Sequence, residues 1–226
     1  MSGPVRLAVF DCDGTLIDSQ GIVVAAMQAA FEAEGLAVPE ARAVRHVVGL
    51  PLVESIQRLA PKAPDPERLA ERYRDAYGDR YGLPEFQEPL FAGAVAALDA
   101  LARAGYVLGI ATGKGRRGLL RVLDRHDLTA RFATLQTADD GPGKPSPDML
   151  LRAMAETAAE PGTTVMIGDT TYDIHMAHNA GVASIAVAWG YHPASDLLAA
   201  GATELIEEFA ALPGLIERLA RGRQCA

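Results

Sequence analysis

The segment Val5-Arg-Leu-Ala-Val-Phe10 runs directly into Asp11-Cys-Asp-Gly-Thr-Leu16 near the start of this 226-residue sequence. The first part is an apolar run that predicts a buried β-strand, and two acidic residues follow at its carboxyl end. Because they stand two positions apart on an extended chain, Asp11 and Asp13 can face the same side. An ionised carboxylate beside a buried strand is costly unless it is paired or metal-bound, which favours a functional site. An ordinary Asp-Gly turn is the alternative interpretation of these residues alone.

Further apolar runs predict other strands of the same sheet, at residues 106–111, 163–167 and 183–188, with 131–135 as a weaker one. Helical patterns separate most of these runs at the spacing that is typical of α/β proteins. The runs are almost continuously apolar, so helices should cover both faces of the sheet. We therefore predict an α/β core with a doubly wound, parallel, Rossmann-like sheet.

One interval interrupts this alternation. Between the first strand and the one that starts near Tyr106 lie four helical patterns, at residues 21–33, 39–48, 52–59 and 66–81. Ordinary connections in such a core are only about 2–6 residues long, or contain one helix. We predict that residues 17–88 form a helical domain inserted into an α/β core made of residues 1–16 and 89–226.

Composition excludes several classes of protein. The sequence has 21 Lys and Arg against 29 Asp and Glu, a net charge of -8, which argues against sequence-independent nucleic-acid binding. The apolar runs are far shorter than the ~18 residues of a membrane-spanning helix. No apolar leader precedes the first strand, and two cysteines, Cys12 and Cys225, make no disulfide framework. We expect a cytoplasmic protein that acts on neither membranes nor nucleic acids.

Polar motifs follow the other predicted strands as well. Thr112-Gly113 follows the second strand, Lys144 lies in a proline-flanked loop, and Gly168-Asp-Thr-Thr-Tyr-Asp173 follows the strand at 163–167. In an open parallel sheet, ligands bind outside the carboxyl ends of the strands. A few carboxylates combined with substrate phosphate suit Mg²⁺. The sequence therefore predicts one site that gathers these residues with Asp11 and Asp13.

With these four motifs in this order, the sequence resembles the haloacid dehalogenase-like superfamily of aspartate-nucleophile phosphohydrolases, in the branch similar to phosphoglycolate phosphatases. The similarity continues into residues 179–181 and 189–191, and the helical insertion matches the cap domain of that superfamily. The resemblance implies a Mg²⁺-dependent phosphatase that hydrolyses a small phosphorylated metabolite, 2-phosphoglycolate or a sugar phosphate, through an aspartyl-phosphate. It leaves open whether the protein is a monomer or a homodimer.

Three alternatives remain. A phosphomutase similar to β-phosphoglucomutase, or a non-catalytic binding protein, would share the fold. Residues 113–118 also satisfy the Gly-x-Gly-x-x-Gly pattern of dinucleotide-binding loops. The acidic residue expected about 20 positions later is missing, so a dinucleotide oxidoreductase is the least favoured alternative.

The resemblance implies a catalytic role for each matching residue. Asp11 would be the nucleophile, and Asp13 would protonate the leaving alcohol and later accept a proton from water. Thr112 and the Gly113 N–H would bind phosphoryl oxygens. Lys144 would neutralise the charge of the phosphate and the nucleophile together.

The resemblance also implies a metal site. Asp169 would bind Mg²⁺ beside the Asp11 carboxylate and the backbone carbonyl of Asp13. Asp173 would support this site through water or through Lys144.

The segment His46-Val-Val-Gly49-Leu-Pro51 resembles the cap loop that faces the active site in relatives. Gly49 would permit a close approach of the backbone, and Arg45 or His46 would meet a carboxylate of the substrate. An ordinary turn between two helices is the alternative interpretation.

Overall fold

A parallel β-sheet forms the centre of the computed structural model, which describes residues 4–224. Its strands are β1 (Val5–Phe10), β2 (Tyr106–Ala111), β3 (Thr134–Gln136), β4 (Ala159–Gly168), β5 (Ala183–Val187) and β6 (Glu204–Ile206). Their order in the sheet is β3-β2-β1-β4-β5-β6, and every pairing is parallel. This order confirms the predicted doubly wound core. It also places the reversal of strand order between β1 and β4, where ligands bind in such sheets.

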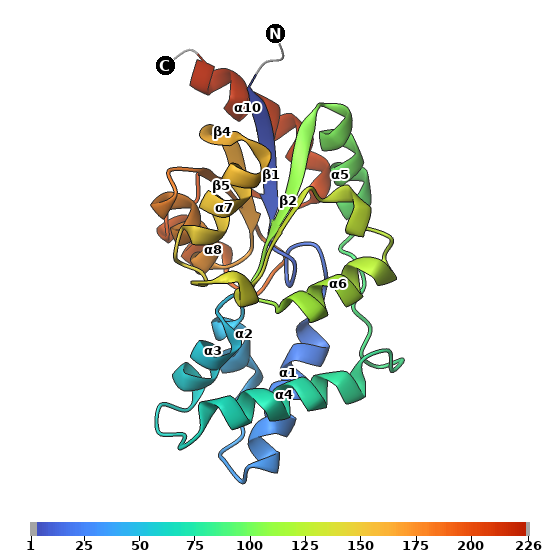
Figure 1. Cartoon of the computed structure of the whole chain (residues 1–226), viewed down its shortest axis with the longest axis vertical. Coiled ribbons are helices and arrows are strands. Elements are labelled where there is room, and N and C mark those ends of the chain that lie inside the picture. The colour runs from blue at the N-terminus through green and yellow to red at the C-terminus, as the bar shows by residue number, and fades with distance from the viewer. Residues whose placement is uncertain (1–3, 225–226) are drawn as a thin grey trace.

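Helices cover both faces of this sheet (Figure 1). The core helices are α5 (Ala94–Arg103), α6 (Arg116–Arg125), α7 (Asp148–Thr157), α8 (Thr171–Asn179), α9 (Ala194–Ala199) and α10 (Leu212–Gln224), with short 3₁₀ turns at Thr129–Arg131, Ala138–Asp140 and Phe209–Ala211. Successive residues of a strand point to opposite faces. Accordingly, Ala8 and Phe10 pack in the cluster formed with α5, α6 and α10, whereas Leu7 and Val9 pack in the cluster formed with α7 and α8.

Four further helices lie beyond the carboxyl ends of the strands, opposite the end where the chain termini lie (Figure 1). They are α1 (Gln20–Ala33), α2 (Ala41–Val47), α3 (Leu52–Leu59) and α4 (Pro66–Arg80). They enclose a hydrophobic cluster of their own, with Met27, Phe31, Ile56 and Leu69 among its buried members. We call residues 17–88, which contain these helices, the cap.

The weakest predicted strand is wrong in its position. Residues 129–131, at the start of the apolar run at 131–135, form a 3₁₀ turn, and β3 starts only at Thr134. The strand has three residues, lies at the sheet edge and pairs with β2 alone. Conversely, β4 begins at Ala159, four residues before its predicted start.

Of the two cysteines, Cys12 is buried, and Cys225 lies outside the described residues.

Candidate active site

Asp11 and Asp169 lie next to each other at the reversal of strand order. Asp11 follows β1, and its backbone N–H donates to the carbonyl oxygen of Ile167 in β4 at 2.9 Å. Asp169 follows β4, and Asp173 lies in the first turn of α8. Carboxylate oxygens of Asp11, Asp169 and Asp173 lie within 4.8 Å of one another, and all three residues are buried. The structure therefore brings together acidic residues that stand more than 150 positions apart in the sequence.

Two donors fix the carboxylate of Asp169. One oxygen accepts a hydrogen bond from the Thr15 hydroxyl at 2.8 Å, and the other accepts from the backbone N–H of Tyr191 at 2.8 Å. Gly14 makes this approach feasible, since it has a φ of +82° and a Cβ there would lie 2.3 Å from Asp169 Oδ2. Burial, followed by the nearby charges of Asp11 and Asp173, raises the pKa of Asp169 well above its usual range.

Lys144 supplies the positive charge of this cluster. Its Nζ lies 3.0 Å from Asp11 Oδ1 and 2.6 Å from Asp173 Oδ1, and its side chain is completely buried. The other oxygen of Asp173 accepts from the N–H and the hydroxyl of Thr170, which caps α8. Burial opposes the charge of Lys144, but the two carboxylates outweigh it and raise the pKa of the lysine. Asp173 thus positions Lys144 directly beside Asp11.

Asp11 has one oxygen held and one oxygen free. Oδ1 accepts from the Cys12 N–H at 2.6 Å and faces Lys144. Among the described residues, Oδ2 has no hydrogen-bond partner, and Asp11 lines the main cavity between core and cap. Burial, together with repulsion from Asp173, raises the pKa of Asp11 to about 7 although Lys144 acts in the opposite direction.

The cluster fits a hard divalent cation. Three buried carboxylates share a single ammonium, so negative charge is in excess and the pKa values of Asp11 and Asp169 rise. Carboxylate oxygens are the ligands that Mg²⁺ takes in proteins, usually one or two together with substrate phosphate. The side chain of Asp13 is not part of this group.

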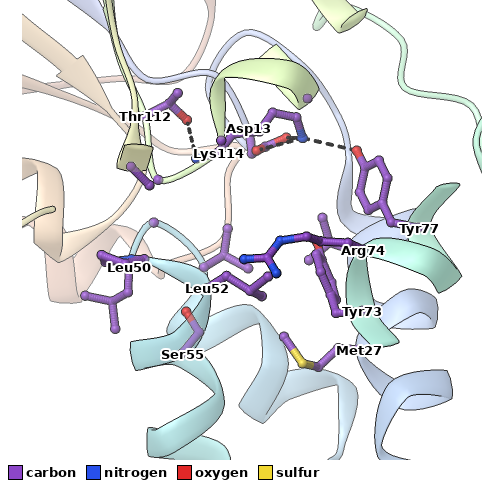
Figure 2. A pocket seen from close by; sticks show the side chains of 18 of the residues that line it. Asp13, Met27, Leu50, Leu52, Ser55, Tyr73, Arg74, Tyr77, Thr112 and Lys114 are labelled. Carbon is purple, nitrogen blue, oxygen red and sulfur yellow. Dashed lines mark hydrogen bonds and ion pairs between the residues drawn. The ribbon is translucent and has the colours of Figure 1, made fainter. Parts of the chain in front are cut away.

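The carboxylate of Asp13 instead points to the cap. Lys114 Nζ lies 2.9 Å from Asp13 Oδ1 and 3.0 Å from Oδ2, and it also donates to the Tyr77 hydroxyl at 3.1 Å (Figure 2). Tyr77, on α4, in turn donates to Glu88, which is buried where the cap chain returns to the core. A chain of polar contacts therefore joins Asp13 to two parts of the cap.

Thr112, Gly113 and Gly49, which the sequence also predicts as site residues, line the same cavity of about 840 Å³. Thr112 and Gly113 follow β2 and line it with Asp11 and Asp13. Gly113 also touches the cap, because a Cβ there would lie 2.6 Å from the carbonyl oxygen of Gly49. The first glycine of the Gly-x-Gly-x-x-Gly loop therefore packs against the backbone of the cap.

The fold and these motifs agree with a comparison to known families. A sequence model described as haloacid dehalogenase-like hydrolase matches residues 8–187, which include all four motifs. The chain belongs to this family.

Several curated relatives of this haloacid dehalogenase-like hydrolase are named as phosphatases. The chain is 34% identical over 216 residues to the probable phosphatase IndB of Dickeya dadantii, covering 94% of each chain. It is 32% identical over 222 residues to a phosphoglycolate phosphatase of Agrobacterium fabrum, covering 94% of this chain and 93% of the relative. The crystal structure of a hydrolase from Pseudomonas syringae superposes with a TM-score of 0.85 at 26% identity, covering 95% of this chain and 99% of that one. These relatives identify the chain as a phosphoric monoester hydrolase.

The cap residues of this hydrolase that were predicted to meet substrate lie in two places. Gly49 lines the main cavity with Asp11. Arg45 and His46 line a second cavity of about 440 Å³. The His46 ring stacks on the His192 ring, with the two ring centroids 4.8 Å apart. The structure therefore brings Gly49, but not Arg45 or His46, to the catalytic motifs.

None of the helices in the described part of the chain has the length and apolar character that a membrane-spanning helix needs.

Sequence reasoning missed the residues that orient the main groups of this hydrolase. The pairing of Lys114 with Asp13, and the contacts of Tyr77 with Lys114 and Glu88, join segments far apart in the chain. One signal was available: Tyr73 and Tyr77 stand at helical spacing i, i+4 on α4, so they share a face. The backbone N–H of Tyr191 that holds Asp169 leaves no signature in the sequence.

Proposed function

We propose that this hydrolase is a Mg²⁺-dependent phosphatase that cleaves a small phosphomonoester through an aspartyl-phosphate on Asp11. The free Oδ2 of Asp11, beside the buried ammonium of Lys144 and at the wall of the main cavity, is the observation that carries the proposal. A carboxylate can act as a nucleophile in this way. The names of the relatives, a probable phosphatase and a phosphoglycolate phosphatase, support phosphate release as the outcome.

In the first step, Asp11 Oδ2 attacks phosphorus, and the bond between phosphorus and the ester oxygen breaks. The leaving oxygen takes a proton from the carboxyl group of Asp13, which lines the same cavity. Lys144 neutralises negative charge on Asp11 and on the phosphoryl group, and Thr112 and the Gly113 N–H bind phosphoryl oxygens. Such fixed charges and donors supply most of the catalysis in phosphoryl transfer.

In the second step, the ionised Asp13 takes a proton from a water molecule whose oxygen attacks the same phosphorus. The acyl-phosphate bond breaks, inorganic phosphate leaves, and Asp11 returns as a carboxylate. Lys114, 2.9 Å from Asp13, neutralises the ionised form of Asp13 between the two steps. The hydrogen bonds from Lys114 to Asp13 and Tyr77 keep this group in a defined orientation.

Asp11, Asp169 and the backbone carbonyl of Asp13 would hold Mg²⁺, with Asp173 within reach of the same position. When bound, the ion supplies Lewis-acid stabilisation of charge on the phosphoryl oxygens. The substrates that the sequence predicts, 2-phosphoglycolate or a sugar phosphate, are monoesters of this kind.

The test is Asp11→Asn, assayed with p-nitrophenyl phosphate in Mg²⁺. We expect turnover to fall below about 0.1% of wild type, since an amide neither attacks phosphorus nor forms the acyl-phosphate. Asp127→Asn, an exposed aspartate beyond α6, is the matched control and should keep full activity. Rapid quench with a ³²P-labelled substrate should trap label on the wild-type protein only. Substantial turnover by Asp11→Asn would refute the proposal.

A further inference from the structure

The main cavity is larger than a small anionic substrate requires. Its volume of about 840 Å³ falls within the range of roughly 300–1,000 Å³ found for pockets that hold ligands of drug size. The catalytic groups occupy only the core side. The cap-side wall includes a group of apolar and aromatic side chains, namely Val23, Met27, Val47, Leu52, Val53 and Tyr73, beside the polar residues Ser55, Arg74, Asp75 and Asp79.

Leu52, Val53 and Tyr73 are only half-buried, so part of their apolar surface is available to a ligand. Figure 2 shows Leu52, Met27 and Tyr73 on the cap side of the cavity, facing the loop that carries Thr112 and Lys114. A ligand that reaches from Thr112 to this wall must therefore present apolar surface where it meets these side chains. Hydroxyl groups placed against these side chains would lose their bonds to water without gaining others.

Arg74 and Tyr73 offer polar groups to a ligand at this wall. Arg74 reaches from α4 into the cavity toward Leu52 (Figure 2), and among the described residues its guanidinium has no ion pair or hydrogen bond. In the same part of the chain, the Tyr73 hydroxyl has no hydrogen-bond partner either, although its ring contacts that of Tyr77. By contrast, Arg68 and Arg72 of the same helix both pair with Glu34. A planar guanidinium is well suited to bind a carboxylate through two parallel hydrogen bonds.

We infer that the substrate is a phosphomonoester with a ring-sized apolar or aromatic body that carries an anionic group at its far end, an inference that rests on the proposed phosphatase function. Its phosphate lies at Asp11, Thr112 and Lys144, and its ring packs against Leu52 and Tyr73. Its carboxylate, or an equivalent anion, binds Arg74. Arg74 and Leu52 are thus specificity residues, and 2-phosphoglycolate fills only the catalytic end of the cavity.

The test compares three esters whose leaving alcohols are all primary: ethyl phosphate, benzyl phosphate and 4-carboxybenzyl phosphate. We expect kcat/KM to rise about tenfold or more from ethyl to benzyl phosphate, because one extra methylene in an apolar pocket is already worth about 10–200-fold. We expect a further rise of about tenfold for 4-carboxybenzyl phosphate, from an ion pair with Arg74. Ethyl phosphate hydrolysed as well as benzyl phosphate would overturn the inference.

Arg74→Gln should reduce the preference for 4-carboxybenzyl over benzyl phosphate to about one, because a neutral amide has no charge for the carboxylate. Arg72→Gln removes the same charge from the same helix outside the cavity and should keep the wild-type preference. Leu52→Asn should reduce the preference for benzyl over ethyl phosphate, whereas Leu83→Asn, at an exposed leucine outside the cavity, should not. An equal loss on all three esters in Arg74→Gln would assign Arg74 to the phosphate and overturn its proposed role.

Binding of the three esters to the Asp11→Asn variant tests the shape of the cavity independently of the proposed phosphatase function. Isothermal titration with the same esters should give a dissociation constant at least about tenfold lower for 4-carboxybenzyl than for ethyl phosphate. If the wild-type protein hydrolyses none of the esters but Asp11→Asn keeps this order of binding, the phosphatase function is wrong and the cavity assignment stands. If the wild-type protein hydrolyses all of them and binding shows no order, the cavity assignment is wrong and the function stands.

Discussion

The ammonium of Lys114 lies 2.9 Å from one carboxylate oxygen of Asp13 and 3.0 Å from the other. Asp13 follows β1 and Lys114 follows β2, so the pair joins two adjacent strand ends. The same ammonium lies 3.1 Å from the hydroxyl of Tyr77, on cap helix α4. One lysine therefore holds the proposed acid–base residue and connects it to the cap.

Lys114→Met should reduce both stability and turnover. It leaves the Asp13 carboxylate without its charged partner in a site that is only 12% exposed at that side chain, which should lower the free energy of unfolding by about 2 kcal/mol. Because Asp13 is then no longer held toward the cavity, kcat should fall by about 10²-fold. Urea unfolding and steady-state kinetics measure the two effects. Lys62→Met, on an exposed cap loop, is the control, and equal behaviour of the two variants would show that the pair has no role.

Mg²⁺ should stabilise the folded protein as well as support turnover. The carboxylates of Asp11, Asp169 and Asp173 converge within 4.8 Å, so a bound cation removes repulsion that exists only in the folded state. At about 100 times its dissociation constant, the ion should add roughly 2.7 kcal/mol to the free energy of unfolding. Thermal unfolding with Mg²⁺, with EDTA, and with Na⁺ at equal ionic strength measures this. Asp169→Asn should lose most of the effect, and a Tm that does not respond to Mg²⁺ in the wild type would contradict the site.

The strand pattern made the core predictable, because buried parallel strands are almost continuous apolar runs that end in polar motifs. The runs before Asp11, Thr112 and Asp169 each correspond to a strand in the structure. Edge strand β3 was misplaced because it pairs on one side only and needs no such run. The apolar runs and the polar motifs after them therefore identified the interior strands of the sheet and the site residues at their ends.

The partners of those groups were not predictable, since they depend on how distant segments pack. Asp13 was expected to act in the site, but nothing near it in sequence indicated Lys114 as its partner. The cap loop was expected to bring Gly49 and either Arg45 or His46 to the active site, and of these three residues only Gly49 lines the main cavity. Successive residues of a helix point in different directions, so Val44 and Val47 of α2 line the main cavity, whereas Arg45 and His46 line the second one.

His192 should make the contact between cap and core sensitive to acid. Its Nδ1 accepts from the Thr171 N–H at 3.1 Å, so Nε2 carries the proton and donates to the His46 carbonyl oxygen at 3.1 Å. Burial, and then the proximity of His46, lowers the pKa of His192 below 6.5. Below pH 6.5 the unfolded chain therefore binds more protons at this residue than the folded chain does, and its contribution to stability is lost as the pH falls.

The difference in free energy of unfolding between wild type and His192→Gln should be about 2 kcal/mol at neutral pH, from two buried hydrogen bonds. It should shrink as the pH falls through 6.5. Urea unfolding at several pH values measures it, with His178→Gln, an exposed histidine of α8, as the control for loss of a histidine. A difference that grows on acidification would contradict this assignment of the proton.

Gly49→Ala should separate the cap loop from the core. Gly49 has a φ of +101°, and a Cβ there would lie 3.0 Å from Thr170 Oγ1 and 3.3 Å from the Tyr172 ring. Gly35→Ala is the matched control, because its φ is +64° and no atom lies within 4 Å of the added Cβ. Both variants should lose about 1–2 kcal/mol of stability from the left-handed backbone. Only Gly49→Ala should also raise KM, by several-fold, since its methyl group displaces a wall of the cavity from Thr170 at the start of α8. Equal KM values in the two variants would show that the contact between Gly49 and the core does not shape the substrate site.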